Sequence, residues 1–157
     1  MTNLFVYGTL KKSFHNHYIL KDQELVGEAE TCNKYIMLSK GIPYVYESSK
    51  AYCGEVGYTQ KVVQGSCIKG EFYKVDDEAL ARIDQLEGHP RWYCRKQINV
   101  CVDICNHMGI HTSRITQAWI YFMKTERSIG GTRYNGYPWF TSNANIVKIK
   151  KLYPIIL

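Results

Sequence analysis

The residue of this chain that is best placed to do chemistry is Glu87, a carboxylate at the end of a predicted helix. The acidic run at residues 76–78 is typical of a helix N-cap and first turn, and Gly88 followed by Pro90 is typical of a helix end. Between these signals an apolar stripe recurs at helical spacing, formed by Ala79, Leu80, Ile83 and Leu86. Glu87 is therefore expected to be the last helical residue, beside this stripe.

The surroundings expected for Glu87 oppose its negative charge. The helix macrodipole is negative at the C-terminal end, where Lys or Arg is favoured over an acid. Partial burial beside the apolar stripe opposes the charge as well. Both effects raise the pKa of Glu87 toward the range that is useful for proton transfer near neutral pH. The alternative is a solvated carboxylate on a fraying last turn, which would have no function.

A second chemical feature is the sequence Y-G-T-L, formed by Tyr7, Gly8, Thr9 and Leu10. The apolar run at residues 4–7 predicts a short strand that ends in a tight loop, and two lysines follow this loop directly. Glycine lets the backbone turn with its N–H groups exposed, and such donors beside basic residues can cradle a carboxylate. Taken alone, a glycine turn after a strand is usually only a turn, so a functional role needs support from other residues.

The sequence gives little support to metal or nucleotide chemistry. Cys101, Cys105, His107 and His111 lie within eleven residues, but their C-x3-C and H-x3-H halves are separated by a single residue and have no partner knuckle. We therefore expect no metal site. The chain has no G-x-G-x-x-G, Walker or G-x-S-x-G motif, which leaves dinucleotide binding, P-loop phosphate binding and α/β-hydrolase chemistry without support.

The length and composition indicate one domain over residues 1–157, long enough to bury a core without metal or disulfide staples. No apolar run approaches the ~18 residues of a membrane span, and the N-terminus reads directly into a strand rather than a signal peptide. We therefore expect a cytoplasmic protein with no membrane partner. The six cysteines include no C-x-x-C pair, and we interpret them as free thiols: Cys32, Cys53, Cys67, Cys94, Cys101 and Cys105.

The formal charge of +6 raises the hypothesis of a nucleic-acid partner. The basic residues, however, form short separate clusters at residues 11–12, 91–96 and 148–151, and thirteen tyrosines are scattered without the signature of an RNA-recognition sheet. A solvated basic surface is the better interpretation. Such a surface could still attract an anionic small molecule.

The order of predicted elements favours an α+β fold with a small mixed, barrel-like twisted sheet and one main helix. Short β-like segments fill residues 25–75, where residues 50–58 are expected to be a loop or a distorted strand. Residues 93–102 alternate as a strand, and residues 115–122 form another. Residues 14–20 predict a short helix, whose histidines are expected to lie at the surface or anchor a loop.

Four segments, taken in order, resemble one known family. They are V-Y-G-T-L-K-K at residues 6–12 with Asn16 and His17, G-E-F-Y-K-V-D at 70–76, I-D-Q-L-E-G-H-P-R-W-Y-C-R at 83–95, and R-Y-N at 133–135. Together they are similar to the gamma-glutamylamine cyclotransferases of the gamma-glutamyl cyclotransferase-like superfamily. The resemblance covers most of residues 1–135, and the pair of Y-G-T-L with L-E-G-x-P-x-x-Y-x-R is its specific part.

The resemblance implies a compact mixed β-barrel with short flanking helices and a pocket in which the Y-G-T-L loop faces Glu87. It implies a cofactor-free enzyme that acts on a small gamma-glutamyl amide, such as epsilon-gamma-glutamyl-lysine, and forms 5-oxoproline and a free amine. Glu87 would be the catalytic acid and base, and residues 7–10 would bind the glutamyl head. Tyr93 and Tyr134 would bind or enclose the substrate, with packing at the barrel mouth as the alternative.

Other residues leave alternatives open. Arg95 either binds a carboxylate or braces the loop in an ion pair, and we favour the ion pair. Ser13 stands where relatives often have glycine, residues 108–113 have no counterpart, and residues 137–157 extend beyond the recognisable region. Gamma-glutamyl amino acids are alternative substrates, and a non-catalytic small-ligand-binding module is the alternative function. The oligomeric state does not follow from the sequence.

Overall fold

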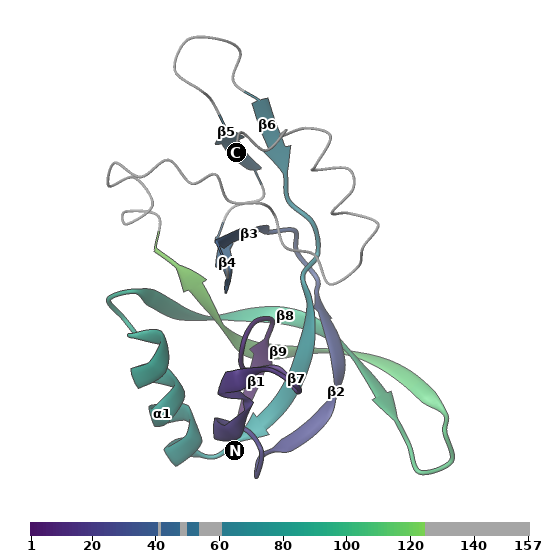
Figure 1. Ribbon diagram of the computed structural model, residues 1–157. Coiled ribbons are helices and arrows are strands. Elements are labelled where there is room, and N and C mark those ends of the chain that lie inside the picture. Colours follow the sequence, from purple (N-terminus) through teal and green to yellow (C-terminus); the bar gives the residue numbers. More distant parts are fainter. Residues whose placement is uncertain (41, 48–49, 54–60, 125–157) are drawn as a thin grey trace.

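The computed structural model describes residues 1–40, 42–47, 50–53 and 61–124, and its centre is a closed barrel (Figure 1). Around the barrel the strand order is β1 (Thr2–Val6), β7 (Lys69–Val75), β2 (Glu24–Thr31), β8 (Tyr93–Cys105) and β9 (His111–Met123). Neighbouring strands are antiparallel except at the closure, where Leu4 of β1 pairs in parallel with Trp119 of β9. The barrel and the main helix confirm the predicted α+β class.

Strand β1 is buried on both of its faces. Leu4 and Val6 belong to the core cluster that also contains the inner side chains of the helix, whereas Phe5 belongs to a second cluster with Phe72 and Ile120 from the barrel strands. A strand buried on both faces has a continuous apolar sequence instead of an alternating one. This explains why residues 4–7 read as an unbroken apolar run.

Helix α1 (Asp77–Glu87) packs against the outside of β1 and has the predicted ends (Figure 1). At its start, the Ala79 N–H donates to Asp76 Oδ1 over 2.7 Å, which is an N-cap hydrogen bond. At its end, Gly88 has φ +62°, a left-handed conformation that glycine adopts without strain. Glu87 is the last helical residue, as predicted.

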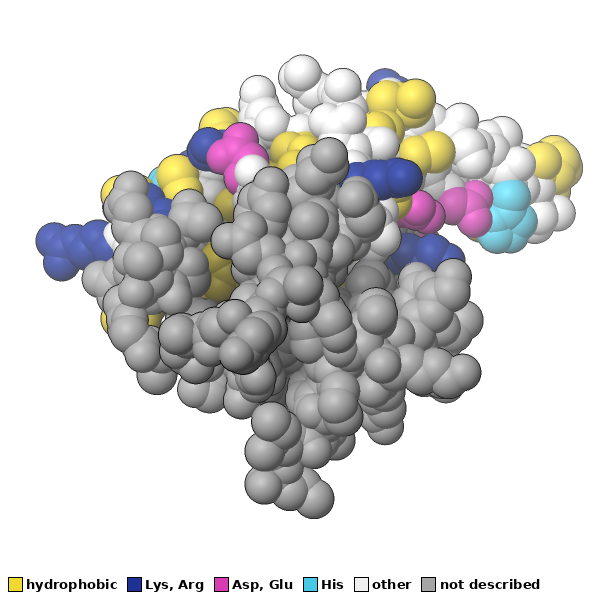
Figure 2. Space-filling model, turned by 90° about the horizontal axis from the view of Figure 1, so that it is seen from above, with side chains coloured by type: hydrophobic (Ala, Val, Ile, Leu, Met, Phe, Trp, Pro, Cys, Tyr) yellow, Lys and Arg dark blue, Asp and Glu magenta, His cyan; other side chains and the backbone are white. Residues whose placement is uncertain are grey.

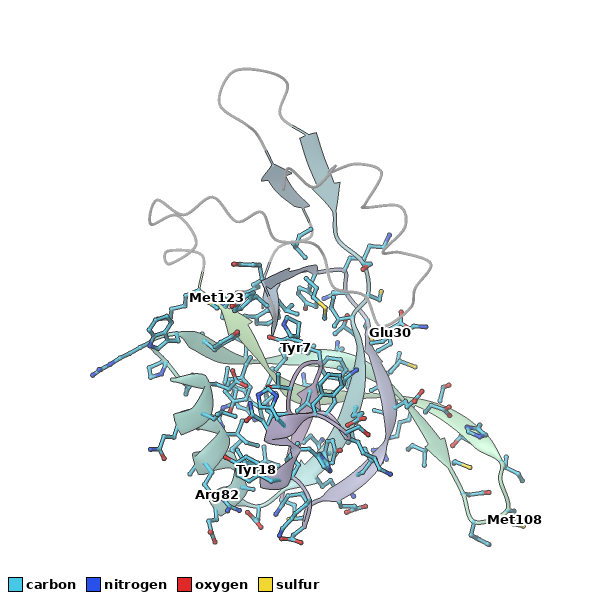
Figure 3. All side chains as sticks on the ribbon, in the orientation of Figure 1. Tyr7, Tyr18, Glu30, Arg82, Met108 and Met123 are labelled. Atoms are coloured by element: carbon cyan, nitrogen blue, oxygen red, sulfur yellow. The ribbon has the colours of Figure 1, made fainter. Side chains whose placement is uncertain are left out.

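The apolar stripe of α1 is buried over its first two turns only. Ala79 and Ile83 are fully buried, whereas the side chain of Leu86 is 41% exposed. The stripe therefore leaves the core at the last turn. Arg82, which Figure 3 labels on the same helix, is exposed to solvent.

Shorter elements complete the described chain. The 3-10 helix η1 (His15–Ile19) confirms the short helix predicted near residues 14–20. Two small two-stranded sheets consist of β3 (Ile36–Lys40) with β4 (Ile42–Tyr46) and of β5 (Lys50–Cys53) with β6 (Lys61–Gln64). Part of the predicted loop or distorted strand at 50–58 is thus the regular strand β5.

Strands β8 and β9 form a long hairpin that projects beyond the barrel, with Met108 at its tip (Figure 3). Residues 108–113, which have no counterpart in the resemblance, lie at this end. Near the tip, His111 Nδ1 lies 2.9 Å from Asp103 Oδ2, so this histidine contacts a carboxylate on the neighbouring strand. The structure describes five of the six cysteines, all of them free thiols, as predicted: Cys32, Cys67, Cys94, Cys101 and Cys105.

The described surface has no single basic face in the view of Figure 2, where the Lys and Arg side chains are separated by other residues. Two of the described lysines are paired with acids: Lys96 contacts Glu47, and Lys74 lies 4.0 Å from Glu24. Within the described ranges, no helix has the length and apolar character needed to cross a bilayer.

Candidate active site

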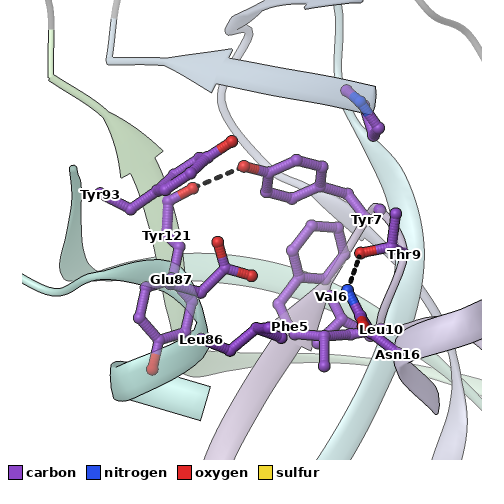
Figure 4. Close-up of a pocket in the computed structure, with 12 residues that line it drawn as sticks. Phe5, Val6, Tyr7, Thr9, Leu10, Asn16, Leu86, Glu87, Tyr93 and Tyr121 are labelled. Carbon is purple, nitrogen blue, oxygen red and sulfur yellow. Dashed lines mark hydrogen bonds between the residues drawn. The ribbon is translucent and has the colours of Figure 1, made fainter. Parts of the chain in front are cut away.

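A pocket of about 230 Å³ lies where the end of α1 meets the loop after β1. Strands β1, β4, β8 and β9 and the 3-10 helix η1 supply the rest of its wall (Figure 4). Six of the predicted site residues line it: Tyr7, Gly8, Thr9, Leu10, Glu87 and Tyr93. The remaining lining residues are Phe5, Val6, Asn16, Pro43, Leu86 and Tyr121.

The Y-G-T-L loop is held from behind by helix η1. Asn16 Nδ2 donates to Thr9 Oγ1 over 2.9 Å, and the Asn16 N–H donates to the Thr9 carbonyl over 3.2 Å. His17 Nδ1 lies 3.1 Å from the Leu10 carbonyl, so this histidine anchors the loop. Loop anchoring was one of the two positions predicted for the histidines of this helix, the other being the surface. Within the described residues, no hydrogen bond uses the N–H groups of Gly8, Thr9 or Leu10. These donors remain free for a ligand.

The end of the same loop turns at Ser13, which has φ +74°. This left-handed conformation is the one that favours glycine, and the chain adopts it without a glycine. Next to it, the Lys12 N–H donates to Glu71 Oε2 over 2.9 Å, and the Tyr73 hydroxyl donates to the same oxygen. Strand β7 therefore fixes the turn that follows the loop.

The Glu87 carboxylate points into the pocket toward the tyrosine side chains (Figure 4). Burial among apolar groups raises the pKa of Glu87 from its ordinary value of 4.5 to about 7. Among the described residues, Glu87 makes no hydrogen bond and no ion pair. A carboxyl in this state can both accept and release a proton near neutral pH.

Three tyrosines surround this carboxyl group. Tyr7 is buried, and its hydroxyl donates to the Tyr121 carbonyl over 2.7 Å. Burial is the largest cause that raises the pKa of Tyr7, with smaller contributions from Tyr93 and Glu87. Tyr93 is buried beside Tyr44, with ring centroids 6.4 Å apart and nearly parallel planes. Aromatic side chains thus form the part of the pocket wall that faces Glu87.

Arg95 is not among the described lining residues, and it forms the predicted ion pair. Its Nη1 is 3.1 Å from Asp84 Oδ2, and its guanidinium lies 4.8 Å from the centre of the Trp119 ring. Asp84 also accepts a 2.5 Å hydrogen bond from the Tyr121 hydroxyl. Tyr121 and Asp84 were not identified from the sequence. The spacing of Asp84 three residues before Glu87, on the same helix face, was the available signal.

Tyr134 is the one predicted site residue that lies outside the described residues, together with Arg133 and Asn135 of the R-Y-N segment.

The fold and the pocket together define the class of the protein: a small barrel whose first strand ends in a glycine loop facing a buried carboxyl group. The sequence comparison agrees, since the family described as gamma-glutamyl cyclotransferase, AIG2-like, matches residues 4–141. The chain belongs to this family. Membership supports gamma-glutamyl cyclotransferase activity.

Several curated proteins are similar in sequence. The "Putative gamma-glutamylcyclotransferase" of Methanocaldococcus jannaschii is 38% identical over 123 residues, which cover 78% of this chain and 84% of that protein. The gamma-glutamylaminecyclotransferase of Rattus norvegicus is 30% identical over 110 residues, or 65% of each protein. The gamma-L-glutamyl-butirosin B gamma-glutamyl cyclotransferase of Niallia circulans is 31% identical over 90 residues, which cover 57% of this chain and 47% of that protein.

A solved structure shows the same fold. The crystal structure of an AIG2-like protein from Mus musculus aligns with a TM-score of 0.61 and 23% identity over 87% of this chain and 88% of that protein. This likeness confirms the predicted fold.

Proposed function

We propose that this protein is a gamma-glutamylamine cyclotransferase, which cleaves a gamma-glutamyl amide to 5-oxoproline and a free amine. The observation that carries the proposal is the position of Glu87, whose burial gives it a pKa of about 7, in one pocket with the unused N–H groups of Gly8, Thr9 and Leu10. Epsilon-gamma-glutamyl-lysine is the proposed substrate. The names of the rat and Niallia relatives, which both refer to gamma-glutamyl compounds, support this choice.

In the proposed reaction the substrate supplies its own nucleophile. Glu87 takes a proton from the substrate α-ammonium, and the resulting amine attacks the gamma-carbonyl carbon of the same molecule. The C–N bond to the leaving amine then breaks as the proton held by Glu87 passes to the leaving nitrogen. The attacking nitrogen loses its second proton to the Glu87 carboxylate, and this proton passes on to the departing amine, which leaves as an ammonium ion. Atoms and charge balance within the substrate and one carboxyl group, so the step consumes no water and needs no protein nucleophile.

The Y-G-T-L loop would hold the glutamyl head in the folded conformation that ring closure requires. Correct orientation of two reacting groups can supply roughly 7 to 11 kcal/mol of barrier reduction. The free N–H groups of Gly8 to Leu10 can bind the α-carboxylate, and any of them aimed at the gamma-carbonyl oxygen would stabilise its developing charge. Tyr7 and Tyr93 would enclose the glutamyl chain.

The charge of the pocket wall supports an amine rather than an amino acid as the leaving group. In a gamma-glutamyl amino acid, a carboxylate lies next to the leaving nitrogen. A pocket that binds such a substrate is expected to have a Lys or Arg close to the scissile bond. None of the described lining residues is Lys or Arg. In epsilon-gamma-glutamyl-lysine the leaving nitrogen ends an aliphatic chain, for which Pro43 and Leu86 offer apolar contacts.

The test is a substrate panel scored by 5-oxoproline release. We expect product from epsilon-gamma-glutamyl-lysine and gamma-glutamyl-butylamine, and less from gamma-glutamyl-alanine. The matched control is epsilon-gamma-glutamyl-lysine acetylated on the glutamyl α-amine, which lacks the nucleophile and should give no product. Product from gamma-glutamyl-alanine alone would favour the amino-acid alternative. Binding without any product would favour a non-catalytic binding module.

We also propose that the protein acts in the cytoplasm, because its described cysteines are free thiols. Cell fractionation of the natural source, with detection by antibody, tests this location.

A further inference from the structure

Two charged residues, Asp84 and Arg95, lie close to the last turn of α1 and are not among the described residues that line the pocket. Asp84 precedes Glu87 by three residues and therefore lies on the same side of α1. Arg95, on the neighbouring strand β8, contacts Asp84 at 3.1 Å. The Asp84 side chain is 25% exposed and that of Arg95 is 18% exposed, so solvent screens this pair only in part.

The ion pair also connects the elements that build the pocket. Asp84 belongs to α1 and Arg95 to β8, and the Tyr121 hydroxyl from β9 donates to Asp84 over 2.5 Å. The Tyr121 carbonyl accepts the hydroxyl of Tyr7 from the loop after β1. The Arg95 N–H donates to His89 Nδ1 over 3.1 Å, in the turn that directly follows Glu87. The end of α1 is thus held by contacts of Asp84, which precedes Glu87, and of His89, which follows it.

Few of the surrounding groups carry a fixed charge. The titratable groups that face Glu87 or its turn are Tyr7, Tyr93 and Tyr121 from the barrel, Arg95 from β8, and Asp84 and His89 from α1 and its turn. Burial raises the pKa of Tyr7 and of Tyr121, so both stay neutral near pH 7. Asp84 and Arg95 are therefore the two groups of fixed and opposite charge among them, and they pair with each other.

We propose that Asp84 and Arg95 are positioning residues whose ion pair fixes the end of α1 and prevents either charge from acting on Glu87. The proposal rests on the proposed function, in which Glu87 carries the proton. Asp84 is not a second catalytic acid, because its carboxylate is engaged by Arg95 and Tyr121. The pair lets burial alone set the proton affinity of Glu87.

Breaking the pair from either side should have opposite effects. In Asp84→Asn, Arg95 becomes an unpaired cation near Glu87, which favours the charged carboxylate. In Arg95→Met, Asp84 loses its cation and becomes an anion on the same helix face as Glu87. This anion disfavours the charged form of Glu87. An unpaired charge at this range should move the titration midpoint of Glu87 by about one pH unit, downward in the first variant and upward in the second.

The experiment is a carboxyl-carbon NMR titration of protein labelled with ¹³C-glutamate, in which Glu87→Gln assigns the Glu87 signal. The double variant Asp84→Asn/Arg95→Met removes both charges and should bring the midpoint back near that of the wild type. Asp103→Asn is the matched control, because it breaks an exposed contact with His111 at the far end of the hairpin and should leave the midpoint unchanged. The pH-rate profile of each variant is recorded in parallel.

Shifts of opposite sign that cancel in the double variant would support the proposal, whereas unchanged midpoints or shifts of one sign would overturn it. If Arg95→Met does not fold, the comparison of Asp84→Asn with the double variant tests the proposal instead. Adding Arg95→Met to Asp84→Asn must then raise the titration midpoint of Glu87 again. The NMR titration requires no turnover, so it separates this proposal from the proposed function. An active Glu87→Gln enzyme would refute the function, whatever the titration shows.

Discussion

The hydroxyl of Tyr7 donates to the backbone carbonyl of Tyr121 over 2.7 Å, which joins two residues that are 114 positions apart in the sequence. Tyr7 begins the loop that is proposed to bind the glutamyl head. Tyr121 lies in β9, and its hydroxyl donates to Asp84 of α1. This single hydrogen bond therefore connects the Y-G-T-L loop to the strand that also contacts α1.

We expect Tyr7→Phe to reduce the free energy of unfolding by about 1 to 3 kcal/mol, because it leaves the buried Tyr121 carbonyl without its partner. The value of kcat/KM should fall as well, since the loop loses its attachment to β9. Urea unfolding and steady-state kinetics measure these effects. Tyr18→Phe is the control, because the Tyr18 side chain is 63% exposed. Equal stability of the two variants would contradict a structural role for the bond.

Ser13→Gly should stabilise the protein by about 0.5 kcal/mol. Ser13 has φ +74°, where a residue with a Cβ costs roughly 1 to 2 kcal/mol more than glycine, and the greater freedom of glycine in the unfolded chain offsets part of the gain. The midpoint of urea unfolding should rise. Ser13→Ala keeps the Cβ and should bring no gain, so stabilisation by alanine but not by glycine would refute the explanation.

The stability of the protein should depend on pH through Glu87. The folded state raises the pKa of Glu87 from 4.5 to about 7, so folded protein binds this proton more tightly than unfolded protein does. The contribution of the Glu87 proton to the free energy of unfolding is complete below about pH 4.5 and is lost as the pH rises through 7. Above pH 7, Glu87→Gln should therefore be more stable than the wild type by about 2 kcal/mol.

Urea unfolding of both proteins at pH 5 and pH 8 measures this difference. Glu78→Gln, an exposed residue in the first turn of α1, is the matched control and should show no such dependence. A difference between wild type and Glu87→Gln that stays constant with pH would show that Glu87 is not buried as described.

Local signals predicted the helix well. The Asp76 cap and the Gly88 turn act over a few residues, so the sequence places Glu87 at the helix end and the structure confirms it. The hydrogen bond of Tyr7 with Tyr121 and the ion pair of Asp84 with Arg95 depend on how distant segments meet when the barrel closes. No periodicity of a single segment contains that information. Leu86 departs from the predicted stripe because the core ends where the pocket begins.

The loop illustrates the same limit. The sequence suggests that Ser13 could alter the turn, because glycine is absent, yet the structure has the left-handed conformation at Ser13. The bonds of Glu71 with Lys12 and of Asn16 with Thr9 hold the loop in place, and both were invisible to a reading of residues 7–13 alone.

The most direct test of the proposed mechanism is the rate of 5-oxoproline release from epsilon-gamma-glutamyl-lysine by Glu87→Gln. We predict a loss of about 10²-fold to 10⁴-fold in kcat, because glutamine cannot transfer the proton, while circular dichroism shows a folded protein. Glu78→Gln, made on the same helix, should retain wild-type turnover. Wild-type turnover by Glu87→Gln would contradict the role of Glu87 as the proton carrier.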